Sequence, residues 1–279
     1  MEIRVARNSG LCYGVKRALR LARETRKRKK GPVLTLGDLI HNPQVIADLE
    51  EQGIRAVEGP DDIGRETVII RSHGVSPEVY SRLKLKNIEI VDATCPIVKK
   101  IQERVESLAG KGEEVIIVGN KDHPESQGLI GYSLGRGVIV ENEKQAAGLP
   151  LKKRRAVLAQ STQDFEVFQK VVGALMERTD ELTVFNTICQ STQTRQKSTS
   201  ELAAKVDTLF IIGGRNSSNT NKLFQLSKRI LPNTYFLEKA DSITPKMLQQ
   251  SKKIGLSGGA STPPEAIQEA VVKIKTCFK

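Results

Sequence analysis

The sequence predicts an α/β protein built from three small domains with mostly parallel sheets. Three of its four cysteines, Cys12, Cys95 and Cys189, each follow an apolar, β-rich run and precede an amphipathic helical pattern. Their spacings are close to a third of the 279-residue chain, which indicates three copies of one structural unit. Because strands that alternate with helices form parallel sheets, each copy is expected to be a small α/β unit.

Each copy opens with the apolar run that leads to its cysteine. These runs, at residues 3–11, 88–94 and 182–188, are expected to be strands that end at the cysteine. Apolar positions three and four residues apart predict the next helices, over residues 15–26, 97–108 and 198–205. We therefore place the domains at residues 13–95, 96–189 and 190–279, with residues 1–12 completing the third.

Two further strands are expected in each copy. The second strands, at residues 33–36, 115–118 and 209–212, run into a glycine and a polar loop that carries His41, His123 or Ser217 at nearly the same distance after the cysteine. The third strands, at residues 68–70, 156–158 and 254–256, lead to loops 71–74, 159–162 and 257–261. A helix start with Pro, Asp or Glu follows each of these loops.

The nine expected strand ends collect the reactive side chains of the chain. All three histidines and three of the four cysteines lie there, which ordinary helix caps and turns do not require. Ligand sites of parallel α/β units lie at the carboxyl ends of the strands. The pattern therefore predicts a functional site at these ends.

Composition narrows the class of protein. The formal net charge of +12 favours an anionic partner, but aromatic residues are only 4% with no Trp, which argues against a base-stacking nucleic-acid binder. The basic runs at residues 26–30 and 152–155 are expected to be solvated surface. Without a run of about 18 apolar residues or an apolar signal core, we expect a cytoplasmic protein with no membrane or nucleic-acid partner.

The three repeated cysteines, one from each unit, could hold one metal centre. Zinc with three thiolates is one option, and a cubane iron–sulfur cluster with one open iron is another. Zinc sites usually draw paired ligands from a short motif such as C-x2-C, which this sequence lacks, so the threefold spacing favours the cluster. Cys277 has no counterpart in the other copies, and we assign it no role.

The remaining polar residues suit an anionic substrate. Neutral or cationic donors next to glycines or at helix starts are typical of phosphate sites; here they are His41, His73, His123, Ser217, Ser218, Asn219 and Ser261. Glu125 is the one acid among them and is a candidate proton donor. Thr162 and Gln163, at a neighbouring strand end, would complete a proton relay.

Several motifs together resemble one known family. They are GLCYGV at 10–15, HNPQV at 41–45, RSHG at 71–74, DATCP at 92–96, HPE at 123–125, Cys189 with TRQ at 194–196, NSSN at 216–219 and GAS at 259–261. Over nearly its whole length the chain resembles the 4-hydroxy-3-methylbut-2-enyl diphosphate reductases, the last enzymes of the non-mevalonate isoprenoid pathway.

The resemblance implies a trefoil of three α/β domains around a central 4Fe-4S cluster on Cys12, Cys95 and Cys189. The implied reaction is the two-electron removal of the substrate's C4 hydroxyl, which gives isopentenyl and dimethylallyl diphosphate. Glu125 would be the proton donor, and Thr162 would contact the substrate hydroxyl. The implied diphosphate-binding residues are His41, His73, His123, Ser217, Ser218, Asn219 and Ser261.

The sequence departs from the family pattern at two places. Tyr13 stands where Ala is usual after the first cysteine, and Ser161 replaces the first Thr of a Gln-Thr-Thr stretch, so either Ser161 or Thr162 could contact the substrate hydroxyl. The alternatives are a quinolinate synthase-like 4Fe-4S enzyme and a non-enzymatic basic nucleic-acid-binding protein. The net charge suggests reduced ferredoxin or flavodoxin as electron donor.

Overall fold

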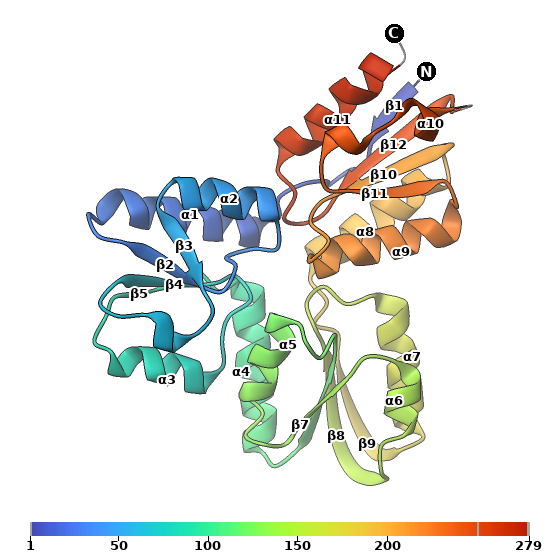
Figure 1. The fold of residues 1–279 in the computed structure, drawn as a ribbon. Coiled ribbons are helices and arrows are strands. Elements are labelled where there is room, and N and C mark those ends of the chain that lie inside the picture. Colours follow the sequence, from blue (N-terminus) through green and yellow to red (C-terminus); the bar gives the residue numbers. More distant parts are fainter. Residues whose placement is uncertain (1, 250, 278–279) are drawn as a thin grey trace. The chain divides into compact units, whose positions relative to one another are not determined.

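Three separate four-stranded sheets form the framework of the chain in its computed structural model, which describes residues 2–249 and 251–277. Every strand pairing within these sheets is parallel. Figure 1 shows helices on both faces of each sheet. The fold class predicted from the sequence, three parallel α/β units, is confirmed. Met1 and residues 278–279, at the two ends of the predicted third domain, lie outside the described residues.

The three sheets share one strand order. The N-terminal sheet has the order β3-β2-β4-β5, the middle sheet β7-β6-β8-β9, and the C-terminal sheet β11-β10-β12-β1. Their strands are β2 (Val33–Leu36), β3 (Ile54–Val57), β4 (Thr67–Ile70), β5 (Ile90–Asp92), β6 (Glu114–Val118), β7 (Gly137–Val140), β8 (Lys152–Ala159), β9 (Thr179–Phe185), β10 (Thr208–Ile212), β11 (Thr234–Leu237), β12 (Lys253–Gly258) and β1 (Glu2–Val5). The first strand of the chain thus belongs to the last sheet.

The helices alternate with these strands. They are α1 (Tyr13–Arg28), α2 (Pro43–Glu51), α3 (Pro77–Leu85), α4 (Pro96–Gly110), α5 (Pro124–Gly131), α6 (Glu143–Ala147), α7 (Phe165–Met176), α8 (Gln190–Ala203), α9 (Ser218–Ile230), α10 (Pro245–Leu248) and α11 (Pro264–Cys277). None of the helices within the described residues is long and apolar enough to span a bilayer.

Two compact units divide the chain. Unit 1 comprises residues 1–15, 41–47 and 190–279 and contains the C-terminal sheet; unit 2 comprises residues 16–40 and 48–189 and contains the other two. Three of the inner strands, β2, β4 and β10, are buried along their whole length. Continuous apolar runs of this kind are expected where helices cover both faces of a parallel sheet.

The sequence prediction missed one edge strand in each sheet, namely β3, β7 and β11. Each is only four residues long and pairs with one neighbour, and each includes half-buried positions. An edge strand of this length has little apolar periodicity to detect. The prediction of three strands per copy was therefore wrong, and the structure has four.

The prediction that each cysteine ends a strand was also wrong. β1 ends at Val5, β5 at Asp92 and β9 at Phe185, and an irregular loop then leads to the cysteine. Apolar residues of those loops, such as Ala6, Ala93 and Ile188, are buried, so the apolar pattern continues past the end of each strand. Helix α8 was predicted to begin at residue 198 but begins at Gln190, because its first turns carry Ser, Thr and Gln instead of an apolar stripe.

One basic run predicted as solvated surface contains a buried arginine. Arg155 on β8 is 0% exposed, and its guanidinium donates 2.5 Å to Glu114 Oε2, 2.8 Å to the Arg178 carbonyl and 2.7 Å to the Pro150 carbonyl. Burial raises the pKa of Glu114, but hydrogen bonds from Lys152 and Arg155 outweigh it and lower that pKa. Arg155 therefore ties together β6, β8 and the start of β9.

Replacing Arg155 with lysine is expected to destabilise the chain by about 3 kcal/mol, because removing one partner of a buried ion pair leaves buried acceptors unsatisfied. The control is Arg154→Lys one residue earlier, whose exposed pair with Glu181 is worth at most about 1 kcal/mol. Urea unfolding of both variants provides the comparison. Equal stability of the two would contradict a structural role for the buried guanidinium.

Candidate functional site

Each of the three repeated cysteines lies at the start of a helix. Cys12 and Cys189 directly precede α1 and α8, and Cys95 is the N-cap residue of α4. The backbone N–H of Val15 donates to Cys12 Sγ at 3.5 Å. All three are partly buried cysteines that form no disulfide bond within the described residues. Because the N-terminus of a helix is electropositive, it favours a negatively charged thiolate ligand.

The backbone N–H of each cysteine is anchored to the loop after the third strand of a sheet. The hydrogen bonds run from Cys12 to the Ala260 carbonyl, from Cys95 to that of Ser72 and from Cys189 to that of Ser161, at 3.0, 2.9 and 2.9 Å. The residues directly after these acceptors are three of the predicted site residues, Ser261, His73 and Thr162. Each cysteine is therefore held next to a loop that carries a candidate substrate-binding side chain.

Within unit 1, the loop of His41 is fastened to the loop of Ser261. Ser261 Oγ donates to the His41 carbonyl at 2.8 Å, and Asn42 Nδ2 donates to the Ser261 carbonyl at 2.9 Å. Asn42 Oδ1 also accepts from the backbone at the start of α2. These bonds fix two predicted diphosphate-binding residues, which are far apart in the sequence, in one place.

The start of α9 lies against the same loops. Ser217 is its N-cap residue and accepts from Thr220 N at 3.3 Å. A Cβ added to Gly259 would come within 2.0 Å of Thr220 Oγ1, so only glycine allows this close approach. The structure thus brings Ser261 next to the helix start that carries Ser217, Ser218 and Asn219.

Asn219 is buried but unsatisfied. Its side chain is 3% exposed, and neither Oδ1 nor Nδ2 has a hydrogen-bond partner among the described residues. Buried amides are normally satisfied, and this one lies in the first turn of α9, where backbone N–H groups are also available to an anion. The combination indicates a ligand-binding position.

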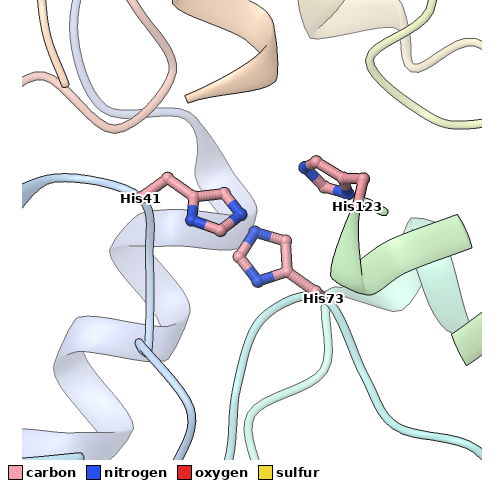
Figure 2. A group of neighbouring side chains, drawn as sticks. All are labelled: His41, His73 and His123. Carbon is pink, nitrogen blue, oxygen red and sulfur yellow. The ribbon is translucent and has the colours of Figure 1, made fainter. Parts of the chain in front are cut away.

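In unit 2, two of the predicted histidines meet. The rings of His73 and His123 pack edge to face, with centroids 5.4 Å apart (Figure 2). His123 is the N-cap residue of α5, and its Nδ1 accepts from Glu125 N at 3.1 Å. Because Nδ1 is the acceptor, the ring proton lies on Nε2, which suits a hydrogen-bond donor to an anion. His41, also labelled in Figure 2, belongs to unit 1.

Glu125 is buried in the first turn of α5 and contacts Ser161. Its side chain is 2% exposed; Oε1 accepts from Ser161 N at 2.6 Å and Oε2 from Ser161 Oγ at 2.8 Å. Ser161 also accepts the Cys189 N–H through its carbonyl. A carboxyl group, a hydroxyl and a cysteine are therefore linked through one residue.

The sequence prediction favoured Thr162 over Ser161 for the contact with the substrate hydroxyl. Thr162 Oγ1 accepts from Gln160 Nε2 at 3.0 Å, whereas both polar groups of Ser161 reach Glu125. Both hydroxyls lie in the same predicted loop, so the sequence could not separate them. The sequence signal at this position was the departure from the family pattern at Ser161, which keeps a hydroxyl.

The loop before Cys95 is held by a charged side chain. Asp92 accepts from Thr94 N at 2.9 Å and from Lys99 Nζ at 2.9 Å. Burial raises the pKa of Asp92, but the hydrogen bonds from Thr94 and Lys99 outweigh it, so the net pKa is below the ordinary value of 3.8. Asp92 is thus a carboxylate at neutral pH. Cys277, at the end of α11, packs beside an apolar core cluster instead.

A protein-family model described as LytB protein matches residues 3–275. The chain is 42% identical to a 4-hydroxy-3-methylbut-2-enyl diphosphate reductase of Caldanaerobacter subterraneus subsp. tengcongensis, with 99% of this chain and 97% of that protein covered. It is 41% identical to the protein of the same description from Aquifex aeolicus, with coverages of 99% and 96%.

Two solved structures are similar as well. One is (E)-4-hydroxy-3-methyl-but-2-enyl diphosphate reductase, described as the terminal enzyme of the non-mevalonate pathway; it is 41% identical, with a TM-score of 0.73 and coverages of 99% of this chain and 100% of that one. The other is the E-1-hydroxy-2-methyl-but-2-enyl-4-diphosphate reductase from Plasmodium falciparum, at 28% identity, with a TM-score of 0.92 and coverages of 97% and 87%.

Proposed function

Because the chain belongs to the LytB family of 4-hydroxy-3-methylbut-2-enyl diphosphate reductases, we propose that it converts (E)-4-hydroxy-3-methylbut-2-enyl diphosphate to isopentenyl and dimethylallyl diphosphate. The substrate takes up two electrons and two protons, its C4–O bond breaks, and the hydroxyl leaves as water. The observation that carries the proposal is the repeated anchoring of Cys12, Cys95 and Cys189 beside loops with candidate substrate-binding residues.

The proposed cofactor is a 4Fe-4S cluster on Cys12, Cys95 and Cys189. The donor set fits, because three cysteines outside disulfide bonds at equivalent helix starts match the three thiolates that such a cluster with one open iron requires. When bound, the cluster would supply electrons and a Lewis-acidic iron for the substrate hydroxyl. The protein's part is to present three thiolates from helix starts that favour negative charge.

The diphosphate is proposed to bind His41, Ser217, Ser218, Asn219 and Ser261 of unit 1 and His73 and His123 of unit 2. In unit 1 the support is the start of α9, where backbone N–H groups and the buried amide of Asn219 are available to an anion. In unit 2 the support is His123, whose Nδ1 is already an acceptor, so that Nε2 is the donor. Many donors are what a diphosphate needs.

Proton delivery is proposed to pass through Glu125. The support is its burial and its two hydrogen bonds with Ser161, which leave the carboxyl group shielded from water and firmly oriented. Ser161 Oγ can both donate and accept, so it can relay a proton to or from Oε2. Thr162, the next residue, remains our candidate for the contact with the substrate hydroxyl.

The proposed electron donor is reduced ferredoxin or flavodoxin, in the cytoplasm. The support is a net charge of +12, which speeds encounter with an acidic protein, and four cysteines that form no disulfide bond within the described residues, which suit a reducing compartment. With ferredoxin as donor, we expect the reduction rate to fall steeply as ionic strength rises. A rate that does not change with salt would contradict this electrostatic docking.

The chain is also proposed to divide into domains at residues 13–95, 96–189 and 190–279, with residues 1–12 completing the third. Sheet membership supports this division, because the strands of the N-terminal and middle sheets lie wholly within the first two ranges. In the C-terminal sheet, β1 pairs with β12 over residues 2–5. The first two proposed domains end with a sheet strand and the cysteine that follows it, and residues 1–12 bring β1 and Cys12 to the third.

The function is tested by anaerobic purification, or reconstitution with iron and sulfide, followed by oxidation of a reduced viologen with and without the hydroxylated allylic diphosphate. We expect about four irons per chain and substrate-dependent oxidation, with both isoprenoid diphosphates formed. A cluster without any response to the diphosphate would refute the substrate, and a chain without iron would refute the cofactor.

The diphosphate site is tested separately by replacing Asn219 with alanine. Losing an unpaired buried amide is expected to weaken binding of inorganic diphosphate by about tenfold, since a hydrogen bond to a charged group is worth about 1.5–3 kcal/mol. Gln225→Ala, an exposed position on the same helix, is the control and should bind normally. Calorimetric titration of both variants distinguishes them, and unchanged affinity of the Asn219 variant would remove this residue from the site.

A further inference from the structure

Arg195, in the TRQ motif, has no part in the proposed reaction, yet it holds the loop that carries Cys12. It lies on α8 and is 2% exposed. Its Nη2 donates to the Gly10 carbonyl at 2.9 Å, and its Nη1 donates to the Asn8 carbonyl. Asn8 and Gly10 have φ values of 62° and 91°, in the left-handed region. The guanidinium therefore fixes an unusual backbone just before the cysteine.

Arg17 holds the loop before Cys95 in the same way. It lies on α1, and its Nη1 donates to the Thr94 carbonyl at 3.1 Å while its Nη2 lies 3.4 Å from the Asp92 carbonyl. The peptide group between Thr94 and Cys95 is thus bonded at both ends, because its N–H donates to the Ser72 carbonyl at 2.9 Å. This arrangement leaves the cysteine backbone little freedom.

The two contacts follow one rule. Each arginine lies near the start of the helix after one repeated cysteine and contacts the loop that leads to another repeated cysteine. In the third copy, Arg104 of α4 lies 4.4 Å from the ring centroid of Phe185 at the end of β9. The loop between β9 and Cys189 is held by Thr187, whose Oγ1 donates to the Ala159 carbonyl. The contact between an arginine and a ligand loop is therefore found at two of the three repeated cysteines, Cys12 and Cys95.

We propose that Arg17 and Arg195 are positioning residues for the iron–sulfur cluster, which hold the loops of Cys95 and Cys12 in the geometry that the cluster requires. The inference rests on the proposed function. Arginine suits this role because its rigid, permanently charged fork can bond two carbonyl oxygens at once, whereas lysine offers a single flexible ammonium group.

Two consequences follow from this role. Loosening a loop that carries a ligand should speed the loss of iron, since removing groups that orient metal ligands typically costs about 10- to 100-fold in metal affinity. Removing a positive charge beside the ligand loops should also make the cluster harder to reduce, because net charge and hydrogen bonding set the potential of such clusters.

The test compares Arg17→Gln and Arg195→Gln with the wild-type enzyme after anaerobic reconstitution. The controls are Arg20→Gln, an exposed position on α1 beside Glu24, and Lys197→Gln, an exposed position on α8. Iron release to a chelator and the midpoint potential, from a dithionite titration followed by electron paramagnetic resonance, are the readouts. We expect about tenfold faster iron release and a more negative potential for the arginine variants alone.

Arg195→Lys separates charge from geometry. Its midpoint potential should lie closer to the wild-type value than that of Arg195→Gln, because lysine keeps the positive charge. Its iron release should be as fast as that of Arg195→Gln, because lysine cannot bond both carbonyls at once. If Arg195→Gln does not fold, iron release and midpoint potential are compared in Arg17→Gln alone, because Arg17 is less buried. Arginine variants that match the wild type in both readouts, or that change only thermal stability, would overturn the positioning role. A wild-type chain that assembles no cluster would instead overturn the proposed function.

Discussion

Replacing Cys95 with serine is expected to abolish cluster assembly and, with it, turnover of the allylic diphosphate. Serine keeps the size of the side chain and the backbone N–H bond to Ser72, but its hydroxyl is a hard ligand that iron–sulfur clusters accept poorly. After anaerobic reconstitution, iron should fall from about four per chain to well below that, and the visible absorption of the cluster should disappear.

The control for this prediction lies in the same chain. Cys277 is also a free, partly buried cysteine, but it packs beside the apolar cluster of α11 and β12. Cys277→Ser should therefore keep full iron content and activity. Normal iron content in Cys95→Ser, or an equal loss in Cys277→Ser, would refute the ligand assignment. Far-ultraviolet circular dichroism of each apoprotein shows whether the fold itself is retained.

The sequence predicted the elements that carry an apolar pattern. The apolar runs of the inner strands were located to within a few residues, because burial on both faces leaves a strong signal; β8 begins four residues earlier than predicted, at the basic residues 152–155. The edge strands β3, β7 and β11 were missed because they are short and half-exposed. The start of α8 was missed for a related reason: Thr192, Arg195 and Gln196 are buried polar residues, and their burial depends on tertiary contacts that periodicity does not record.

For the site, repeat spacing was more informative than any single residue. It identified the loops after the second and third strands of each copy, which is where His41, His123 and Ser261 lie. It could not reveal that the loop of Ser261 is bonded to that of His41, nor that Ser161 contacts Glu125. Such pairings join residues far apart in sequence, so no local pattern encodes them.

Replacing Glu125 with glutamine is expected to lower turnover by about 10²- to 10⁴-fold, the usual contribution of a positioned acid, while the KM changes little. The amide has the shape of the carboxyl group, and its oxygen can still accept the Ser161 N–H bond, but it carries no transferable proton. Steady-state kinetics with a reduced viologen measure both constants, and the visible spectrum verifies that the cluster is intact.

Glu166→Gln is the matched control, because Glu166 stands in the first turn of α7 as Glu125 does in α5, but it is exposed. Its turnover should be normal. Ser161→Ala should lose less activity than Glu125→Gln, because it removes one donor to Oε2 while the Ser161 N–H still holds Oε1. Full activity of Glu125→Gln would exclude proton transfer through this carboxyl group. A larger loss in Ser161→Ala than in Glu125→Gln would make the serine hydroxyl, instead of the glutamate, the group that the reaction depends on.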